Sequence, residues 1–386
     1  MRSLRSLAFL IGAVVCRDGG AAVHSEAGHF LIQKYESKAY SASPQNWAVV
    51  EDKRGFLLVG NNEGLLEFDG VQWRRIALPN RSAVRSLAVD ASGRVFVGGQ
   101  GIAGYLAPDT DGNPRFVSIV DQLGPGERTF GNVSSVVAAS DGVYFSAPEV
   151  LIRWDGKAVR TWKAAGDFRR GFLIDGVLHI VVKGVGLQRL VSNELTAARG
   201  GEQFRDQDVR AAFRDARGIL LVTAKGLMRQ TLDGFAPAPS DATPLLDRNA
   251  VYSAIQLRGG SLALGTTRGG ILILGPDGKM ERILTKESGL PSDYIAAMSM
   301  DRQGGVWIAT GNGIARFDAT VTDFDERSGL RGSVFAVARH NGTLYAGTSS
   351  GLFRMKAAAL GEPAKFEAVE GVADAVFVLA VRGNAL

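Results

Sequence analysis

Residues 304–318 read GGVWIATGNGIARFD, and the order of residue types in this stretch decides the fold. An apolar run, a turn with Gly311 and Gly313, a second apolar run and a closing Asp318 follow one another. The same order appears in VVEDKRGFLLVGNNEGLLEFDG at residues 49–70. Asp favours local backbone hydrogen bonds and Gly supplies the positive φ angle that tight turns need. A phosphate-binding loop would instead lead into a helix and a Lys-Ser/Thr pair, so we interpret the stretch as strands joined by turns.

The unit recurs along the whole chain. The Asp, Asn or Gly that opens its first turn stands at positions 52, 90, 141, 175, 215, 259, 301 and 341, a period near forty. The second turn recurs at Gly64, Gly101, Gly186, Gly226, Gly270, Gly313 and Gly351, and a third at Asp69, Asp111, Asp155, Asp233 and Asp277. Three turns in each period imply four strands, which is one blade of a propeller. The sequence therefore predicts an all-β β-propeller of four-stranded antiparallel blades, with about eight repeats and the start of a ninth at 376–381.

Composition excludes several classes of protein. The chain has 386 residues, 49 of them Gly, and a formal net charge of +5. The basic residues are scattered, so we expect no nucleic-acid partner. The histidines, His24, His29, His179 and His340, lack metal-ligand spacing, and we expect neither a metal nor a cofactor. No later apolar run reaches the length of a membrane span.

The N-terminus has the features of an export signal. Arg2 and Arg5 precede an apolar stretch from Leu7 to Cys16, which small residues follow. This pattern predicts a signal peptide over residues 1–25 and a periplasmic or extracellular location. A buried first helix and a lipid anchor at Cys16 are the alternatives. Cys16 is the single cysteine of the chain, so a processed chain would have no disulfide.

The repeat resembles the two-component regulator propeller repeat, most closely in QNWAVVEDKRGFLLVGNNEGLLEFDGVQW at 45–73 and in 76–106. The resemblance covers nearly all of the chain after residue 25. It implies the periplasmic sensor region of a bacterial two-component protein, in which seven-bladed propellers stand in tandem, bind ligands such as carbohydrate oligomers and carry no catalysis. Any kinase or other output activity would lie on a further C-terminal part or on a partner chain.

The resemblance also divides the chain into parts. Residues 26–43 are an N-terminal extension, 44–328 the seven blades of a first propeller, and 329–386 the start of a second. The strand expected at Phe30–Tyr35 is a candidate partner for a blade that lacks a strand. A ninth strand that closes a ring with earlier blades is the other arrangement that we consider.

A ligand of such a propeller would bind where loops meet at one mouth of the central channel. We expect the turns between the second and third strands of the blades to form that mouth. The polar residues of these turns are Asn61, Asn62, Gln100, Lys183, Lys225, Arg268, Asn312 and Ser350. They suit a polar, anionic ligand such as an acidic sugar oligomer. The tryptophans, Trp47, Trp73, Trp154, Trp162 and Trp307, are expected in blade cores, with stacking on sugar rings as the alternative.

Two other functions stay open. SMDRQGGVW at 299–307 approaches the Asp-box of sialidases, with Arg268 and Tyr294 as further candidates, which would make the chain an enzyme acting on polysaccharide. The spacing differs, because Gly304 follows Asp301 by three residues rather than two. No Gly-x-Ser-x-Gly elbow is present, and turn positions explain the aspartates better than paired-carboxylate catalysis does. The third hypothesis is a scaffold for protein interactions.

Overall fold

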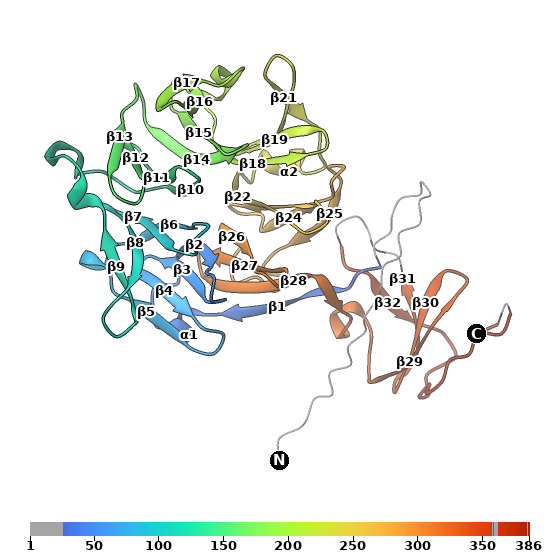
Figure 1. The fold of residues 1–386 in the computed structure, drawn as a ribbon. Helices are drawn as coiled ribbons and strands as arrows, with labels where there is room; N and C mark the ends of the chain where they lie inside the picture. The colour runs from blue at the N-terminus through green and yellow to red at the C-terminus, as the bar shows by residue number, and fades with distance from the viewer. Residues whose placement is uncertain (1–25, 357, 359–361, 384) are drawn as a thin grey trace. The chain divides into compact units, whose positions relative to one another are not determined.

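The computed structural model describes residues 26–356, 358, 362–383, 385 and 386 (Figure 1). The signal peptide predicted at 1–25, with Cys16, lies outside the described residues. Contacts divide the chain into two compact units. One comprises Ile32–Met280 and Leu284–Phe317, and the other the described residues up to Leu31, Glu281–Ile283 and those from Asp318 on.

The described residues form eight four-stranded sheets, which confirms the predicted all-β propeller fold. The first six sheets along the chain are each built from four consecutive strands in chain order. These are β2 (Asn46–Glu51), β3 (Leu57–Asn61), β4 (Gly64–Phe68) and β5 (Trp73–Ile76); β6 (Val84–Val89), β7 (Val95–Gly99), β8 (Ile102–Pro108) and β9 (Pro114–Ser118); β10 (Ser135–Ala139), β11 (Gly142–Ala147), β12 (Val150–Trp154) and β13 (Val159–Trp162). They continue with β14 (Phe168–Ile174), β15 (Val177–Val182), β16 (Gly186–Val191) and β17 (Glu194–Ala197); β18 (Val209–Asp215), β19 (Gly218–Thr223), β20 (Gly226–Gln230) and β21 (Phe235–Ala238); β22 (Val251–Gln256), β23 (Leu262–Thr266), β24 (Ile271–Leu274) and β25 (Met280–Leu284).

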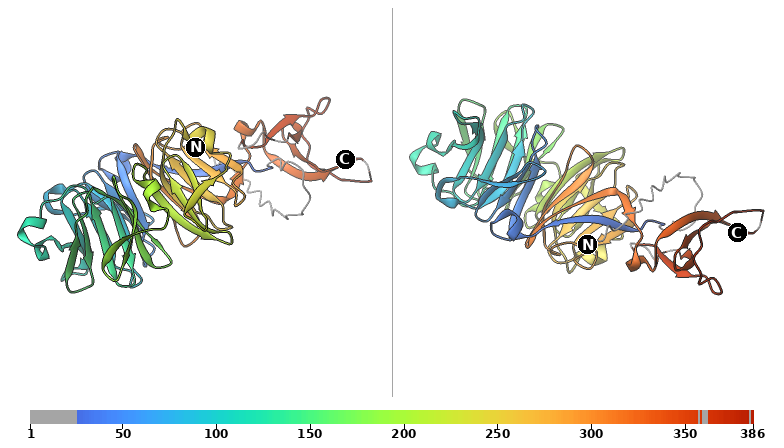
Figure 2. Two further views of the ribbon diagram at one scale, coloured as in Figure 1. Left: turned by 90° about the horizontal axis from the view of Figure 1, so that it is seen from above. Right: turned by 90° about the horizontal axis from the view of Figure 1, so that it is seen from below.

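The seventh sheet is completed by the beginning of the described chain. Its order is β1-β28-β27-β26, so β1 (His29–Tyr35) is the outer strand of β26 (Ile295–Met300), β27 (Gly305–Thr310) and β28 (Gly313–Asp323). Figures 1 and 2 show the blue β1 beside the orange β28. The innermost strand β26 packs beside β22 on one side and β2 on the other, which closes a ring of seven blades. The chain segment at Phe30–Tyr35 thus supplies a fourth strand to a blade that would otherwise have three.

The core of the ring lies in the wedges between neighbouring sheets. One cluster holds Leu58 and Leu65 of the first sheet with Val84 and Val97 of the second. Another joins Val59 to Trp307 and Ala309, which are the first and the seventh sheet. Because the ring sheets are covered on both faces, a second strand such as β3 or β27 is buried at every residue.

Glycines allow neighbouring blades to approach closely. A Cβ atom on Gly60 would lie 2.8 Å from Cγ1 of Val84, the first residue of the next inner strand. A Cβ on Gly265 would lie 2.6 Å from Cγ2 of Ile295 in the same way. The glycine at the end of a blade's second strand is therefore required by the packing of the following blade, beyond any need for a turn.

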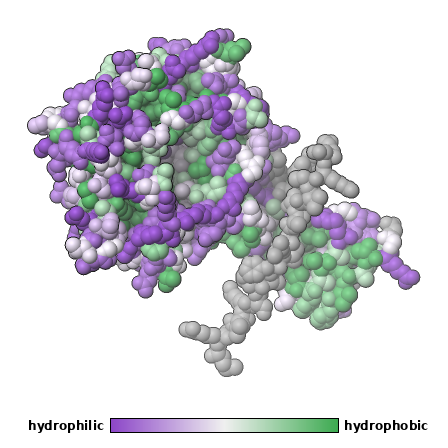
Figure 3. All heavy atoms as spheres, viewed as in Figure 1, coloured by the Kyte–Doolittle hydropathy of each residue, from purple (hydrophilic) through white to green (hydrophobic). Residues whose placement is uncertain are grey.

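The eighth sheet belongs to the other unit. It contains β29 (Val334–His340), β30 (Thr343–Thr348), β31 (Gly351–Lys356) and β32 (Lys365–Ala368). Side chains of its inner strand are exposed, with Phe335 at 46%, and Phe335 stacks on Phe377 with 4.7 Å between the ring centroids. In Figure 3 apolar side chains gather over this unit.

Helices are short. The α-helices are α1 (Ser37–Tyr40) and α2 (Thr243–Leu246), and the 3-10 helices are Pro79–Arg81, Val120–Gln122, Pro125–Glu127, Gly201–Phe204 and Glu326–Ser328. No helix among the described residues is long and apolar enough to cross a membrane.

Candidate functional site

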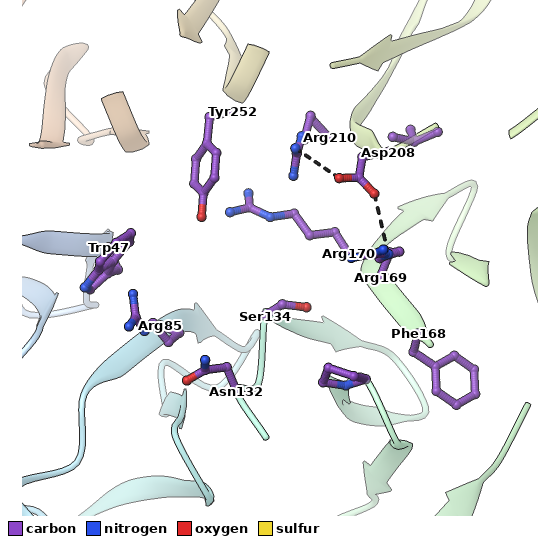
Figure 4. Close-up of a pocket in the computed structure, with 12 residues that line it drawn as sticks. Trp47, Arg85, Asn132, Ser134, Phe168, Arg169, Arg170, Asp208, Arg210 and Tyr252 are labelled. Atoms are coloured by element: carbon purple, nitrogen blue, oxygen red, sulfur yellow. Dashed lines mark ion pairs between the residues drawn. The ribbon is translucent and has the colours of Figure 1, made fainter. Parts of the chain in front are cut away.

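A pocket of about 300 Å³ opens where the innermost strands of the ring begin. Six of the seven blades contribute to its lining, so the pocket lies at one mouth of the central channel (Figure 4). The space-filling view shows the ring hollowed at its centre (Figure 3). The lining residues are Trp47, Arg85, Asn132, Ser134, Pro148, Phe168, Arg169, Arg170, Asp208, Val209, Arg210 and Tyr252.

A repeated irregularity of the backbone directs side chains into this pocket. The pairing of each of six inner ring strands with its neighbour shifts register at the strand's beginning, for example between Val84 and Ser86 and between Val209 and Ala211. The residue inside the shift, such as Arg85 or Arg210, is unpaired, and such a bulge re-aims its side chain. Five of the six bulges place lining residues of the pocket there: Trp47, Arg85, Arg169 with Arg170, Arg210 and Tyr252.

The sequence around five of the six bulges follows one pattern. A residue at most 1% exposed comes first, the bulged residue second and a small residue third. The triplets are Asn46-Trp47-Ala48, Val84-Arg85-Ser86, Val209-Arg210-Ala211, Val251-Tyr252-Ser253 and Ile295-Ala296-Ala297. Val133-Ser134-Ser135 in the third blade has the same order of residues. The outer two residues serve packing between blades, which leaves the middle one free to vary in chemistry.

The pocket has an excess of positive charge. Four arginines line it against a single carboxylate, that of Asp208. This carboxylate is shared between Arg210, at 3.1 Å, and Arg169, at 3.7 Å, the two ion pairs dashed in Figure 4. The Arg210 guanidinium also donates through Nε to the carbonyl oxygen of Val251 at 3.2 Å.

The other two arginines have no anionic partner. Within the described residues neither Arg85 nor Arg170 forms an ion pair or a hydrogen bond, and Nε of Arg85 is buried without an acceptor. A buried donor that lacks an acceptor costs about 1–3 kcal/mol. An incoming anion would remove that cost.

Aromatic rings hold both of these guanidinium groups in place. Arg85 lies over the ring of Trp47, with Cζ 3.9 Å from the ring centroid, and Arg170 lies 5.0 Å from that of Tyr252. Trp47 is itself fixed, because its Nε1 donates to Oδ1 of Asn62 at 3.3 Å. Tyr294, which precedes β26 of the seventh blade, touches the rings of both Trp47 and Tyr252. The aromatic side chains therefore orient guanidinium groups. The Arg85 guanidinium group covers the ring face of Trp47 on which a sugar ring would have to stack.

Burial affects the titration of these groups. Desolvation lowers the pKa of Arg85 and of Arg210 below the usual value for arginine, and the Asp208 carboxylate opposes this change at Arg210. Arginine remains charged at neutral pH even so. Burial, with a hydrogen bond to Tyr252, raises the pKa of Tyr294, so this phenol is neutral over the physiological range. The pocket thus keeps its positive charge at any pH that the protein meets.

The residues predicted as channel-mouth ligands lie elsewhere. None of the eight lines the pocket, although six of the seven ring residues among them are exposed: Asn62, Gln100, Lys183, Lys225, Arg268 and Asn312. Asn61 is fully buried, and its Nδ2 donates to Ser43 O, Gln45 O and Asn46 Oδ1. Ser350 belongs to the other unit and is exposed. A role of these residues in ligand binding stays a prediction, and Asn62 touches the pocket through Trp47.

The side chains of Asp301, from the candidate Asp-box, and of Trp154 and Trp307 contribute to turns and cores of the blades. Asp301 accepts from Gly305 N at 2.7 Å and pairs with Arg316 at 2.7 Å, inside the turn of its hairpin. Trp154 and Trp307 are buried in core clusters, at 5% and 8% exposure. No group of three or more metal-ligating side chains occurs in the part of the chain that the structure describes.

The family comparison identifies one repeat. Residues 289–312 match the family described as two component regulator propeller. This match confirms the resemblance predicted from the repeat. No curated protein matches the chain.

Solved structures share the fold at low identity. The extracellular domain of BT3049 from B. thetaiotaomicron, assigned to the hybrid two component systems, aligns with a TM-score of 0.62 and 20% identity over 86% of this chain and 49% of that one. The extracellular domain of BT4673 from the same organism aligns at 0.58 and 15% over 88% and 47%. The chain therefore spans about half the length of these sensor domains. Virginiamycin B lyase from Staphylococcus aureus aligns at 0.56 and 13% over 75% and 99%. At these identities the likeness shows the propeller fold.

Proposed function

We propose that this chain is an exported, ligand-binding propeller of a two-component signal transduction system. The observation that carries the proposal is the pocket at the channel mouth, where four arginines face one carboxylate and two of the arginines lack an anionic partner among the described residues. The two-component regulator propeller repeat at 289–312 and the likeness to extracellular sensor domains support the signalling context. Its partners are a polar ligand, with a carbohydrate oligomer as the first candidate, and an output module that carries the signal.

We propose binding rather than catalysis at this site. The carboxylate of Asp208, the one acidic side chain in the lining, is already engaged in ion pairs with the guanidinium groups of Arg169 and Arg210. The lining contains no histidine or glutamate. An enzyme acting on polysaccharide is the second candidate, because virginiamycin B lyase has the same fold.

We also propose that residues 329–386 begin a second propeller after the ring at 44–328. Within that unit, a Cβ on Gly347 would lie 2.7 Å from Cγ1 of Val376, and Val376 N donates to Thr348 O at 2.9 Å. Val84 stands in the same relation to Gly60 in the ring. Val376 thus occupies the position at which the inner strand of a next blade begins.

Thermal shift and product analysis on the purified chain test the proposal. Neutral and acidic oligosaccharides are added one at a time, and the melting temperature and the released sugars are measured. A ligand that binds the folded state alone raises the melting temperature, by an amount that follows its concentration over its Kd. Stabilisation without turnover is the expected result. Cleavage products would favour the enzyme, and no stabilisation by any member of the panel would contradict ligand sensing by this chain.

A further inference from the structure

We infer that the pocket recognises two separate oxyanion groups of one ligand, one at Arg85 and the other at Arg170. The inference rests on the proposed binding function and specifies the chemistry of the ligand. Carboxylate, phosphate and sulfate share this chemistry, because the planar guanidinium group pairs with each through two parallel hydrogen bonds.

The positive charge of the pocket is balanced only by a ligand with more than one negative charge. Four guanidinium groups and the Asp208 carboxylate give a net charge of +3 in about 300 Å³. Arg169 and Arg210 share Asp208, so two of the three surplus charges sit on Arg85 and Arg170. A ligand with a single anionic group would neutralise one of these and leave the other unpaired.

The two arginines stand on different blades. Arg85 is the bulged residue of β6 in the second blade, and Arg170 is that of β14 in the fourth. The third blade between them contributes Ser134, whose hydroxyl donates to Ser146 O at 3.3 Å, and the exposed amide of Asn132. Small polar side chains between two cationic ones leave room for the body of a ligand whose anionic groups are at its two ends. Figure 4 shows both guanidinium groups directed into the pocket, with Asn132 below them.

Both guanidinium groups are held before any ligand arrives. Each lies over an aromatic ring, Trp47 for Arg85 and Tyr252 for Arg170. A held guanidinium loses less conformational entropy when it binds an anion. The volume of the pocket, at the lower end of the range for small-molecule sites, favours a compact ligand or the end of an oligomer over a long polymer lying flat.

Calorimetric titration with ligands of graded charge tests the inference. The probes are maltose with no charge, glucuronate with one carboxylate, digalacturonate with two, and fructose 1,6-bisphosphate with two phosphates. We expect the better of the two probes that carry two anionic groups to bind at least ~10-fold more tightly than glucuronate, and its identity distinguishes carboxylate from phosphate. Adding salt should weaken the binding of either probe with two anionic groups more than that of glucuronate, because more charge is screened.

Single substitutions then assign the two groups. Arg85→Gln and Arg170→Gln should each reduce the affinity for the better probe with two anionic groups to the affinity that the parent has for glucuronate. The double variant should bind neither this probe nor glucuronate. Arg85→Lys keeps the charge but lacks the planar fork, so an intermediate affinity is expected. Arg115→Gln, on the exposed outer strand β9, is the matched control and should bind as the parent does. Circular dichroism confirms folding, which neither substitution should abolish, since within the described residues neither guanidinium group has an ion pair or a hydrogen bond to lose.

The failures are distinguishable. The inference would be overturned if glucuronate and both probes with two anionic groups bound with equal affinity. It would also be overturned if Arg85→Gln bound the better of these two probes as tightly as the parent does. Tight binding of maltose that is insensitive to both arginine substitutions would leave the proposed function in place while removing its anionic ligand. No binding of any probe would overturn the inference, and the wider oligosaccharide panel then decides the proposed function separately.

Discussion

Replacing Asn61 by alanine should destabilise the ring, because this side chain is structural although its turn faces the channel mouth. Asn61 is fully buried, and its amide donates to Ser43 O at 2.6 Å, Gln45 O at 3.1 Å and Asn46 Oδ1 at 2.8 Å. It also accepts from Glu63 N at 2.9 Å. The segment that it holds leads from the outer strand of the seventh blade to the inner strand of the first. Asn61 is therefore part of the ring closure.

The expected loss follows from the bonds that would be broken. Within the described residues Asn46 Oδ1 has no other hydrogen bond, so Asn61→Ala leaves it buried and unsatisfied at a cost of about 1–3 kcal/mol. The remaining lost bonds add to this, for a total of about 3 kcal/mol. In a domain of this size such a change lowers the melting temperature by about 6 °C.

The test compares the melting temperatures of Asn61→Ala, Asn62→Ala and the parent, measured by monitoring thermal unfolding with circular dichroism. Asn62 is the next residue in the same turn, but it is exposed and only accepts one bond from Trp47 Nε1. Its loss should change stability by less than about 0.5 kcal/mol. If Asn61→Ala melts at the parent temperature, or Asn62→Ala is the less stable of the two, the assignment of Asn61 to ring closure is wrong.

Three further expectations concern packing, buried charge and pH. Gly98→Val should lower stability by about 1–3 kcal/mol, since a Cβ there would lie 2.5 Å from a valine of the next blade. Gly126→Val should have little effect, because open space surrounds Gly126. Equal melting temperatures of the two variants would refute the role of Gly98 in blade packing. Glu67→Gln should cost about 3 kcal/mol, because this fully buried carboxylate pairs with two arginines, while Glu63→Gln at the surface should cost nothing measurable in denaturant titrations. Anion binding by the pocket should be constant from about pH 6 to 9, because its arginines stay charged and the raised pKa of Tyr294 keeps that group neutral; an inflection near neutrality in the calorimetric titration would implicate another group.

The sequence predicted the strands well because each blade repeats its own local signals. Asp and Gly at fixed positions set the turns, and the structure has Gly55, Gly93 and Gly304 at positive φ where these turns were expected. From the sequence, the pairing of β1 with β28 could only be named as a possibility. The two strands are neighbours in the ring but lie at opposite ends of its sequence, and no local pattern indicates the contact.

The site was harder to predict, for a physical reason. Polar residues in the turns suggested ligands, yet the side chains of the pocket come from bulges at the beginnings of strands. A regular alternation of faces would direct these side chains into the blade wedges, and the register shift reverses that. The signal was present as the triplet of a buried residue, a variable residue and a small residue. Val84-Arg85-Ser86 and Val209-Arg210-Ala211 become informative only when aligned across the blades.

Closure of the ring by β1 also determines when the protein can finish folding. Asn46 donates to the carbonyl oxygen of Gly313 across 267 residues, and Gly313 N donates to Pro44 O. Contacts of such sequence separation form late, because the entropy of closing the intervening loop must be overcome before they contribute. Until β28 has been synthesised, β1 is a strand without neighbours and a site for mispairing with other chains. The last step of folding therefore unites the earliest and latest strands of the ring, and the channel mouth takes its final form at that step.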